Sequence, residues 1–384
     1  MKKKKLRKKK IKNLLSRKKL ELGKKIIIAG GGTGGHIFPA LSIANALRKK
    51  EPDMDILFIG AKGKMEMEKI PEAGYPIEGI DIAGYNRSSL IKNVALPYKL
   101  IKSFLQVKGI FKAFKPQAAI GVGGYSTFPA LRYAQSRGIP TFIHESNSIA
   151  GRANRMLGKK ATRIFTASDG MEKFFPFTKL MHTGNPVRMS VVSNQVSRES
   201  GIVFFGLDPS LTTVLVTGGS LGARSMNEAI DAGIPQLIKN KIQLIWQTGK
   251  SFSKQAAVHA EESKLIWTGE FISKMEYAYA AADIVVSRSG SVLYELCVVR
   301  KPVIFVPFPY AAEDHQTANA ENLVNKNAAI MIPDKNAHEQ LVPEIIRLAN
   351  NIPEQEMLKE NIGKLAITDA DVKIANEILK ILND

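Results

Sequence analysis

The chain of 384 residues contains one cysteine, Cys297, and two tryptophans. A single thiol cannot form an internal disulfide, so the composition fits a reducing compartment and a fold stabilised by packed cores. No segment approaches the roughly 18 uninterrupted apolar residues that a membrane-spanning helix needs. The basic N-terminus also lacks the apolar segment and cleavage site of a secretory signal. These absences favour a globular protein, long enough for two domains.

Acidic residues are scarce at the start of the chain. The formal net charge is +20, but residues 1–25 hold fourteen Lys or Arg and one acid, so this segment carries +13 and the remainder +7. We predict a basic, disordered extension over residues 1–23. Its lysines are interleaved with Leu and Ile, which suits an anionic bilayer, while nucleic acid or a solubilising role are the alternatives.

Short apolar runs alternate with helix-like stretches, a pattern typical of parallel sheets covered by helices on both faces. The runs that read as strands are 26–29, 56–59, 118–122, 140–144, 163–167, 213–217, 242–246, 265–268, 283–286, 303–306 and 329–332. Glycine turns follow both the first run and the run at 213–217. We therefore predict an α/β fold of two doubly wound, Rossmann-like domains that face a cleft. The predicted N-terminal domain is 24–186 and the C-terminal domain 187–367, with a final helix, 368–384, packing back onto the first domain.

The turn after the first strand is the most informative segment. Residues 26–40 read IIIAGGGTGGHIFPA, an apolar strand followed by five glycines and the start of a helix. Such a turn binds anions, because glycine lets a ligand approach the main chain and a helix N-terminus presents free N–H groups.

Two nucleotide-binding patterns resemble this turn and fit poorly. The glycine spacing satisfies G-x-G-x-x-G, but the second strand, 56–59, is followed by Gly-Ala-Lys at 60–62, not by the acid that would hold a ribose. A P-loop would need lysine after its last glycine, where this chain has His36.

Further polar segments follow predicted strands, at the sheet edge where open α/β folds bind ligands. They are 121–125, 144–147, 287–291 with Glu295 one helical turn later, and 313–319. Small residues at a helix start can accept a diphosphate, and a carboxylate inside the helix can bind ribose hydroxyls. Close packing at the glycines of 121–125 and simple helix capping at 287–291 are the alternative interpretations.

Seven motifs in order, GGTGGHxFPA, GVGGY, HExN, GNPVR, GGSxGAR, SRSGS and DHQ, resemble those of the MurG family, the peptidoglycan N-acetylglucosaminyltransferases of glycosyltransferase family 28. The resemblance covers nearly everything after residue 24. It implies a GT-B fold and inverting transfer of N-acetylglucosamine from UDP-N-acetylglucosamine to the C4 hydroxyl of the N-acetylmuramoyl sugar of lipid I, forming lipid II. The expected location is peripheral, on the cytoplasmic side of the inner membrane.

Two other functions stay open at this point. A related GT-B enzyme would glycosylate another lipid, such as diacylglycerol. A protein of a different class would bind membranes or nucleic acid through its basic residues and keep only a vestigial nucleotide fold.

The family's donor contacts, carried over to this chain, fall on both predicted domains. They are Thr33, Gly34, Gly35, Asn147, Arg188, Ser220, Ile272, Ser291, Glu295 and Gln316. The resemblance implies that Arg188 supplies a fixed cation, Ile272 offers backbone groups to uracil and Glu295 holds the ribose. The chain departs from the family at Ser146 and Leu221, where glutamine is common.

Inverting transfer needs a base that takes the acceptor's proton and an anion site opposite that base. His36 is our first candidate for the base, with Glu145 and a substrate-positioning Tyr125 as rivals. We predict no cofactor and no essential metal. The D-x-D sequence at 53–55 precedes the second strand and therefore lies at the sheet edge away from the glycine turns.

Lipid I is held in a membrane, so the implied enzyme needs a docking surface. The stretch 90–115 alternates apolar residues with lysines, which suits an amphipathic surface at the bilayer interface, whereas ordinary helix packing is the alternative. The expected partners are UDP-N-acetylglucosamine, lipid I and an anionic membrane surface, without nucleic acid.

Overall fold

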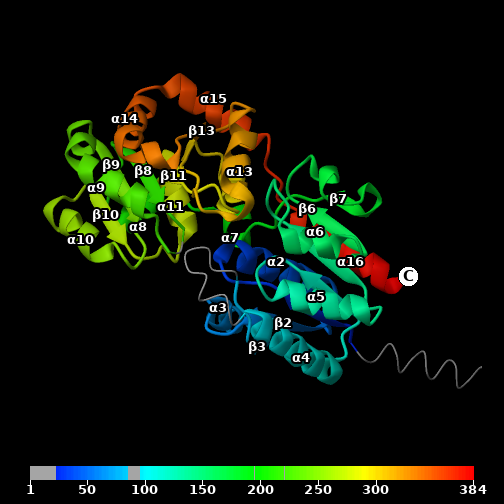
Figure 1. Ribbon diagram of the computed structural model, residues 1–384. Helices are drawn as coiled ribbons and strands as arrows, with labels where there is room; N and C mark the ends of the chain where they lie inside the picture. The colour runs from blue at the N-terminus through cyan, green and yellow to red at the C-terminus, as the bar shows by residue number, and fades with distance from the viewer. Residues whose placement is uncertain (1–22, 85–95, 194, 220) are drawn as a thin grey trace, which may run out of the picture.

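Two parallel sheets, one in each half of the chain, form the frame of the protein (Figure 1). The computed structural model describes residues 23–84, 96–193, 195–219 and 221–384. The first sheet has seven strands in the order β3-β2-β1-β4-β5-β6-β7, and the second has six in the order β10-β9-β8-β11-β12-β13. In each sheet the order reverses beside the first strand, β1 or β8, which is the doubly wound topology. The predicted fold class is confirmed.

The central strands of the N-terminal sheet are buried on both faces, as parallel strands between helices must be, and its edge strands are partly buried. The strands of this sheet are β1 (Lys25–Ala29), β2 (Asp55–Ala61), β3 (Ile77–Ile80), β4 (Ala118–Gly121), β5 (Thr141–Glu145), β6 (Arg163–Thr166) and β7 (Leu180–His182). Ile27 at its centre pairs with Leu57 of β2 and Ala119 of β4, and it is completely buried.

Helices cover both faces of this sheet. They are α2 (Gly34–Lys50), α3 (Glu66–Glu72), α4 (Leu96–Phe114), α5 (Thr127–Ser136) and α6 (Arg152–Gly158), followed by the short 3-10 turns η2 (Met171–Lys173) and η3 (Phe177–Lys179). Side chains of α2 pack on one face and those of α4, α5 and α6 on the other, giving two separate apolar clusters.

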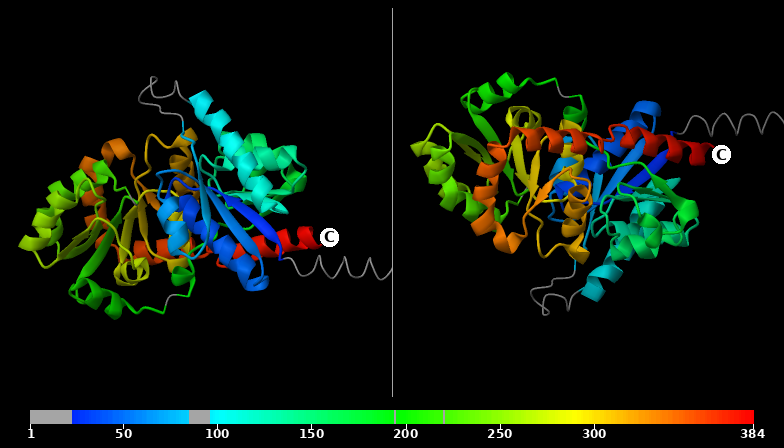
Figure 2. Two further views of the ribbon diagram at one scale, coloured as in Figure 1. Left: turned by 90° about the horizontal axis from the view of Figure 1, so that it is seen from below. Right: turned by 90° about the horizontal axis from the view of Figure 1, so that it is seen from above.

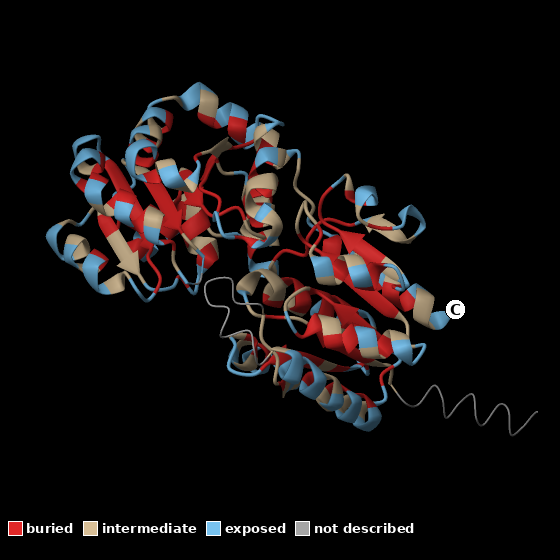
Figure 3. Cartoon of the chain, viewed as in Figure 1, coloured by how far each residue is buried: buried red, intermediate tan, exposed pale blue. Residues whose placement is uncertain are grey.

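The C-terminal domain repeats this arrangement. Its strands are β8 (Thr212–Thr217), β9 (Ile242–Gln247), β10 (Ile266–Gly269), β11 (Ile284–Ser287), β12 (Val303–Phe305) and β13 (Ile330–Met331). Its helices are α7 (Met189–Val192), α8 (Arg198–Phe205), α9 (Arg224–Lys239), α10 (Ser253–Glu262), α11 (Met275–Ala281), α12 (Val292–Val299), α13 (His315–Val324), α14 (Ala337–Ala349) and α15 (Ile352–Gly363), with 3-10 turns η4 (Ala312–Asp314) and η5 (Asp334–Asn336). Figure 3 shows the central strands of both sheets buried and the outward helix faces exposed.

The chain crosses between the domains twice. It leaves the first sheet between β7 and α7, and it returns between α15 and the last helix, α16 (Ala370–Asn383). Figure 2 shows α16 lying along the N-terminal domain. There Ile374 and Ile378 join the apolar cluster of α2, and Glu377 forms an ion pair of 2.7 Å with Arg163 of β6.

Two strands, β3 and β7, differ from the sequence-based expectation, which placed none at these positions. β3 forms one edge of the first sheet and β7 the other, and both strands are short and only partly buried. An edge strand pairs on one side only, so it lacks the continuous apolar run by which the central strands are recognised.

Replacing Ile374 by Ala should lower the free energy of unfolding of the N-terminal domain by about 2–5 kcal/mol, because the lost methylenes leave a cavity against α2. Urea unfolding followed by circular dichroism measures this loss. Val372→Ala, on the exposed side of the same helix, is the matched control and should change stability by less than about 0.5 kcal/mol. Equal unfolding midpoints for the two variants would contradict this role of α16.

Candidate active site

The N-termini of two helices, one from each domain, meet across the cleft. Helix α2 begins directly after the first glycine turn, and α12 begins after Ser291. A Cβ atom added to Gly35 would lie 2.8 Å from the Ser291 hydroxyl, so only glycine lets the two segments approach this closely. Thr33, the residue before α2, is exposed and its hydroxyl caps no backbone group, which leaves it free for a ligand. Partial positive charge from both helices converges here.

A buried carboxylate braces the first glycine turn. Glu66 accepts a hydrogen bond of 2.7 Å from the Gly32 N–H and one of 3.0 Å from the Ala61 N–H. A Cβ atom on Gly31 would lie 2.3 Å from its carboxyl carbon. The group held by this part of the turn is therefore the protein's own Glu66 side chain, and only the N–H groups at the start of α2 are left for a ligand. Sequence reasoning missed Glu66, because it stands four residues beyond the position where a nucleotide-binding acid would be sought.

His36 has the geometry of a general base. Its Nδ1 lies 3.0 Å from the Gly31 carbonyl oxygen, which can only accept, so Nδ1 carries the proton and Nε2 the free lone pair. Nε2 faces the second glycine turn, since a Cβ atom on Gly123 would lie 2.6 Å from it. Burial lowers the pKa of His36 below its usual 6.5.

The neighbouring histidine, His144, is buried at the end of β5 close to the Gly184 backbone, and neither ring nitrogen makes a hydrogen bond of good geometry with a described residue. Burial lowers the pKa of His144 to about 4. The imidazole is thus neutral near pH 7 and adds no positive charge for a phosphate.

Glu145 is occupied as a hydrogen-bond acceptor. One carboxylate oxygen accepts from the backbone and side-chain nitrogens of Asn147, both at 3.1 Å, and the other accepts from the Gly151 N–H and from Asn154. With both oxygens engaged, Glu145 is better suited to holding the 145–151 loop than to removing a proton. Tyr125, the other rival to His36, is 47% exposed and its ring contacts Gly84 at the cleft mouth.

Arg188 forms an ion pair with Glu295, although the family resemblance predicts a separate ligand contact for each residue. The guanidinium donates two hydrogen bonds to the carboxylate, at 2.7 and 2.6 Å, and stacks 4.7 Å from the Phe38 ring of α2. The Tyr279 hydroxyl donates to the same carboxylate at 2.8 Å. The Glu295 carboxylate raises the pKa of Arg188, so the cation is permanent.

The remaining donor contacts lie on the C-terminal side. The Ile272 N–H donates to Gln247 at 2.9 Å, so of its two backbone groups the carbonyl is the one left for a ligand. Gln316 opens α13 beside Ser289, whose hydroxyl donates to the Gln316 carbonyl at 2.7 Å. Ser220 lies outside the described residues.

Asn319 joins the two walls of the cleft, a role that sequence reasoning did not give it. Only 1% exposed, it accepts from the Ser148 N–H at 2.8 Å and donates to Asn147 at 3.3 Å and to the Ser289 carbonyl at 3.0 Å. Asn319 lies three residues after Gln316 and therefore on the same face of α13, and this spacing could have indicated its role from the sequence.

No group of three or more His, Cys, Asp or Glu side chains that could hold a metal ion occurs within 23–84, 96–193, 195–219 and 221–384. Asp53 and Asp55 lie at the start of β2, and the glycine turn follows the opposite end of the neighbouring strand β1.

The comparisons agree with this geometry. Residues 26–166 match the glycosyltransferase family 28 N-terminal domain, and residues 213–375 match the C-terminal domain of that family. A protein of Phocaeicola vulgatus named UDP-N-acetylglucosamine–N-acetylmuramyl-(pentapeptide) pyrophosphoryl-undecaprenol N-acetylglucosamine transferase is 49% identical over 94% of this chain and 97% of its own. A protein of the same name from Cytophaga hutchinsonii is 47% identical over 94% and 97%.

Solved structures share the two-domain architecture. The crystal structure of Acinetobacter baumannii MurG superimposes with a TM-score of 0.73 at 26% identity, over 93% of this chain and 99% of that one. A UDP-N-acetylglucosamine 2-epimerase from Neisseria meningitidis, at 15% identity and a TM-score of 0.65 over 93% and 100% of the two chains, shares the fold alone. The chain therefore belongs to glycosyltransferase family 28 and, within it, to the MurG transferases.

Proposed function

We propose that the protein transfers N-acetylglucosamine from UDP-N-acetylglucosamine to the C4 hydroxyl of the N-acetylmuramoyl sugar of lipid I, with inversion, forming lipid II for peptidoglycan synthesis. The observation that carries this proposal is the relationship at 49% identity, over 94% of the chain, to a transferase named for these two substrates. The site supports it, because a free imidazole lone pair and two helix N-termini face one cleft.

His36 acts as the base in this proposal. Its Nε2 takes the C4 hydroxyl proton as the oxygen attacks C1 of the donor sugar, and the bond between C1 and the diphosphate oxygen breaks to release UDP. The hydrogen bond from Nδ1 to the Gly31 carbonyl fixes the tautomer that this step needs. Glu145 serves as a positioning residue, holding Asn147 toward the transferring sugar.

The diphosphate binds on the C-terminal side in this proposal. Glu66 already occupies the Gly32 N–H, so the first glycine turn is left to contact the sugars through Thr33, Gly34 and Gly35. The start of α12 and Arg188 then meet the phosphate charge. Nε and Nη2 of Arg188 hold the Glu295 carboxylate in place for the ribose, which leaves Nη1 as the nitrogen that can donate to the phosphate.

Membrane docking falls to helix α4 in this proposal. Tyr98, Ile101 and Leu105 are 67%, 64% and 63% exposed and recur on one side of the helix, while Val107 and Phe111 are buried against the domain. Residues 90–95 of the predicted surface and the extension 1–22 lie outside the described residues. No helix that the structure describes is long and apolar enough to span a bilayer. We infer a peripheral position on the cytoplasmic side of the inner membrane, stabilised by exposed apolar side chains and lysines.

The acceptor is tested by a transfer assay with labelled UDP-N-acetylglucosamine. Lipid I should be glycosylated and diacylglycerol, supplied at equal concentration in the same detergent micelles, should not. Transfer to diacylglycerol alone would replace the proposed function by that of a related lipid glycosyltransferase.

His36→Gln should lower kcat by about 10²–10⁴-fold, because glutamine can still donate to the Gly31 carbonyl but cannot take a proton. In the unmodified enzyme, kcat/KM should be level around pH 7 and fall only below pH 6.5. The reason is that the lowered pKa of His36 keeps its imidazole neutral to a lower pH than usual. A fall that begins above pH 7, or an unchanged pH profile in His36→Gln, would assign the base elsewhere.

Replacing Ile101 and Leu105 together by Ser should weaken binding to anionic vesicles about tenfold or more, because each side chain loses the burial of an aliphatic group in the interface. Vesicle flotation measures the bound fraction. Val203→Ser, 78% exposed on α8 of the other domain, is the control and should bind normally. Full-chain protein should also bind better than protein lacking residues 1–23, and equal binding would reject a membrane role for the extension.

A further inference from the structure

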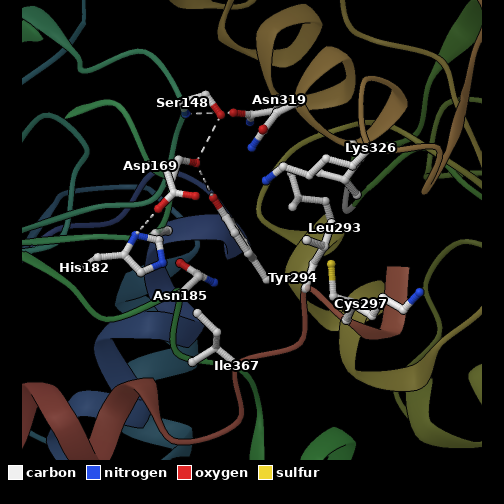
Figure 4. Close-up of a pocket in the computed structure, with 16 residues that line it drawn as sticks. Ser148, Asp169, His182, Asn185, Leu293, Tyr294, Cys297, Asn319, Lys326 and Ile367 are labelled. Carbon is white, nitrogen blue, oxygen red and sulfur yellow. Dashed lines mark hydrogen bonds and ion pairs between the residues drawn. The ribbon is translucent and has the colours of Figure 1, made fainter. Parts of the chain in front are cut away.

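One partly buried hydroxyl joins the two domains beside the predicted donor site. The Tyr294 hydroxyl of α12 donates to the Ser146 carbonyl at 2.8 Å and lies 3.1 Å from the hydroxyl of Ser168, which follows β6. Ser168 in turn lies 3.1 Å from the Ser148 hydroxyl, and the Ser148 N–H donates to Asn319 of α13. The loop 145–148 is thus held by the C-terminal domain at two points, Tyr294 and Asn319. Figure 4 shows Tyr294, Ser148 and Asn319.

The surroundings of Tyr294 make this contact important for the domain arrangement. A cavity of about 210 Å³ lies between the domains, lined on one side by Asp169, His182 and Asn185 and on the other by Cys297 and Lys326 (Figure 4). Apolar packing cannot fix the domains where a cavity separates them, because its walls have no contact atoms across the gap. Directional hydrogen bonds at its edge must set the spacing.

Two ion pairs with Glu313 also cross the interface, but they hold the domains less firmly. Arg152 lies 2.9 Å from Glu313 and Arg155 lies 3.5 Å from it, but the Arg152 side chain is 84% exposed. Exposed pairs of this kind contribute little, whereas a buried carbonyl that loses its donor stays unsatisfied unless water reaches it. Ser146 is buried, so its carbonyl favours the joined arrangement only while Tyr294 supplies a donor.

Tyr294 also stands between two residues of the site. Ser291, three residues earlier, faces Gly35 across the cleft, and Glu295, the next residue, holds Arg188. We propose that Tyr294 is a positioning residue, an interdomain latch that holds α12 at the correct distance from the 145–148 loop for the donor to contact both walls. The kinetic part of this inference rests on the proposed function, whereas the structural part does not.

The single cysteine of the chain provides a built-in reporter of the latch. Cys297 lies in the wall of the cavity, one turn after Tyr294, and is 2% exposed. Burial raises the pKa of its thiol to about 12, so in the joined arrangement almost no thiolate is present to react. Separation of the domains hydrates the thiol. The rate at which it attacks 5,5′-dithiobis(2-nitrobenzoate), releasing coloured thionitrobenzoate as the mixed disulfide forms, then measures the open population.

Tyr294→Phe removes the hydroxyl and keeps the ring. We expect its Cys297 to react about tenfold faster than in the unmodified chain, the equivalent of one hydrogen bond worth about 1.4 kcal/mol. The KM for UDP-N-acetylglucosamine should rise about two- to tenfold with kcat changed less than about twofold, because the reactive arrangement is less populated but unaltered once formed. Saturating UDP should slow the thiol reaction in both proteins.

Tyr75→Phe is the matched control. The Tyr75 hydroxyl donates to Asn45 at 2.7 Å within the N-terminal domain, so this variant loses a comparable hydrogen bond without touching the interface. It should react at the normal rate. Ser168→Ala, which removes the second partner of Tyr294 from a position outside α12, should raise the rate in the same direction by a smaller factor.

Equal thiol reactivity in Tyr294→Phe and Tyr75→Phe would overturn the latch. A fast thiol reaction in Tyr294→Phe together with a normal rate in Ser168→Ala would also overturn it, because the effect would then come from a local disturbance of α12. The thiol assay contains no acceptor. If Tyr294→Phe shows the faster thiol reaction but the unmodified enzyme does not glycosylate lipid I, the latch is supported and the proposed function is rejected. If the enzyme glycosylates lipid I but Tyr294→Phe reacts at the normal rate, the proposed function is supported and the latch is rejected.

Discussion

The ion pair between Arg188 and Glu295 is the interaction on which the arrangement of the site depends. Arg188 lies in the first crossover between the domains and stacks on Phe38 of α2, while Glu295 belongs to α12 and also binds Tyr279 of α11. The pair thereby ties the crossover to both helices whose N-termini meet in the cleft. Removing one partner of a largely buried pair leaves the other charge unpaired, which costs about 3–5 kcal/mol. The cleft is therefore organised before a ligand arrives.

Two more carboxylates follow the same principle. Glu66 holds the first glycine turn and Glu145 holds the loop that carries Asn147, each by accepting hydrogen bonds from backbone or amide nitrogens. Donors that already point at a carboxylate do not have to be reoriented during a reaction, and such preorganisation is a main source of rate enhancement. The Glu66 carboxylate also gives the two helix N-termini different roles. It already occupies the Gly32 N–H of the first glycine turn, so the start of α12 is the stronger site for the diphosphate.

The sequence was sufficient for the central strands, the glycine turns and the pairing of two doubly wound domains, since these depend on local apolar runs and on turn residues. It was insufficient for β3 and β7, whose short edge strands lack such runs. Contacts between distant residues were also out of reach: Arg188 and Glu295 are 107 positions apart, and nothing in their spacing indicates that they bind each other. Glu66 was missed for the same reason, because its partners come from the preceding strand and from the glycine turn.

The departures from the family pattern acquire a physical reason at the interface. At position 146, where the family commonly has glutamine, Ser146 is buried and contributes its carbonyl, not a long side chain, to the contact with the other domain. A tyrosine at position 294 is long enough to reach that carbonyl from α12. The two positions thus meet in the fold, and a side chain at 294 too short to reach this carbonyl would leave it without the donor that Tyr294 supplies.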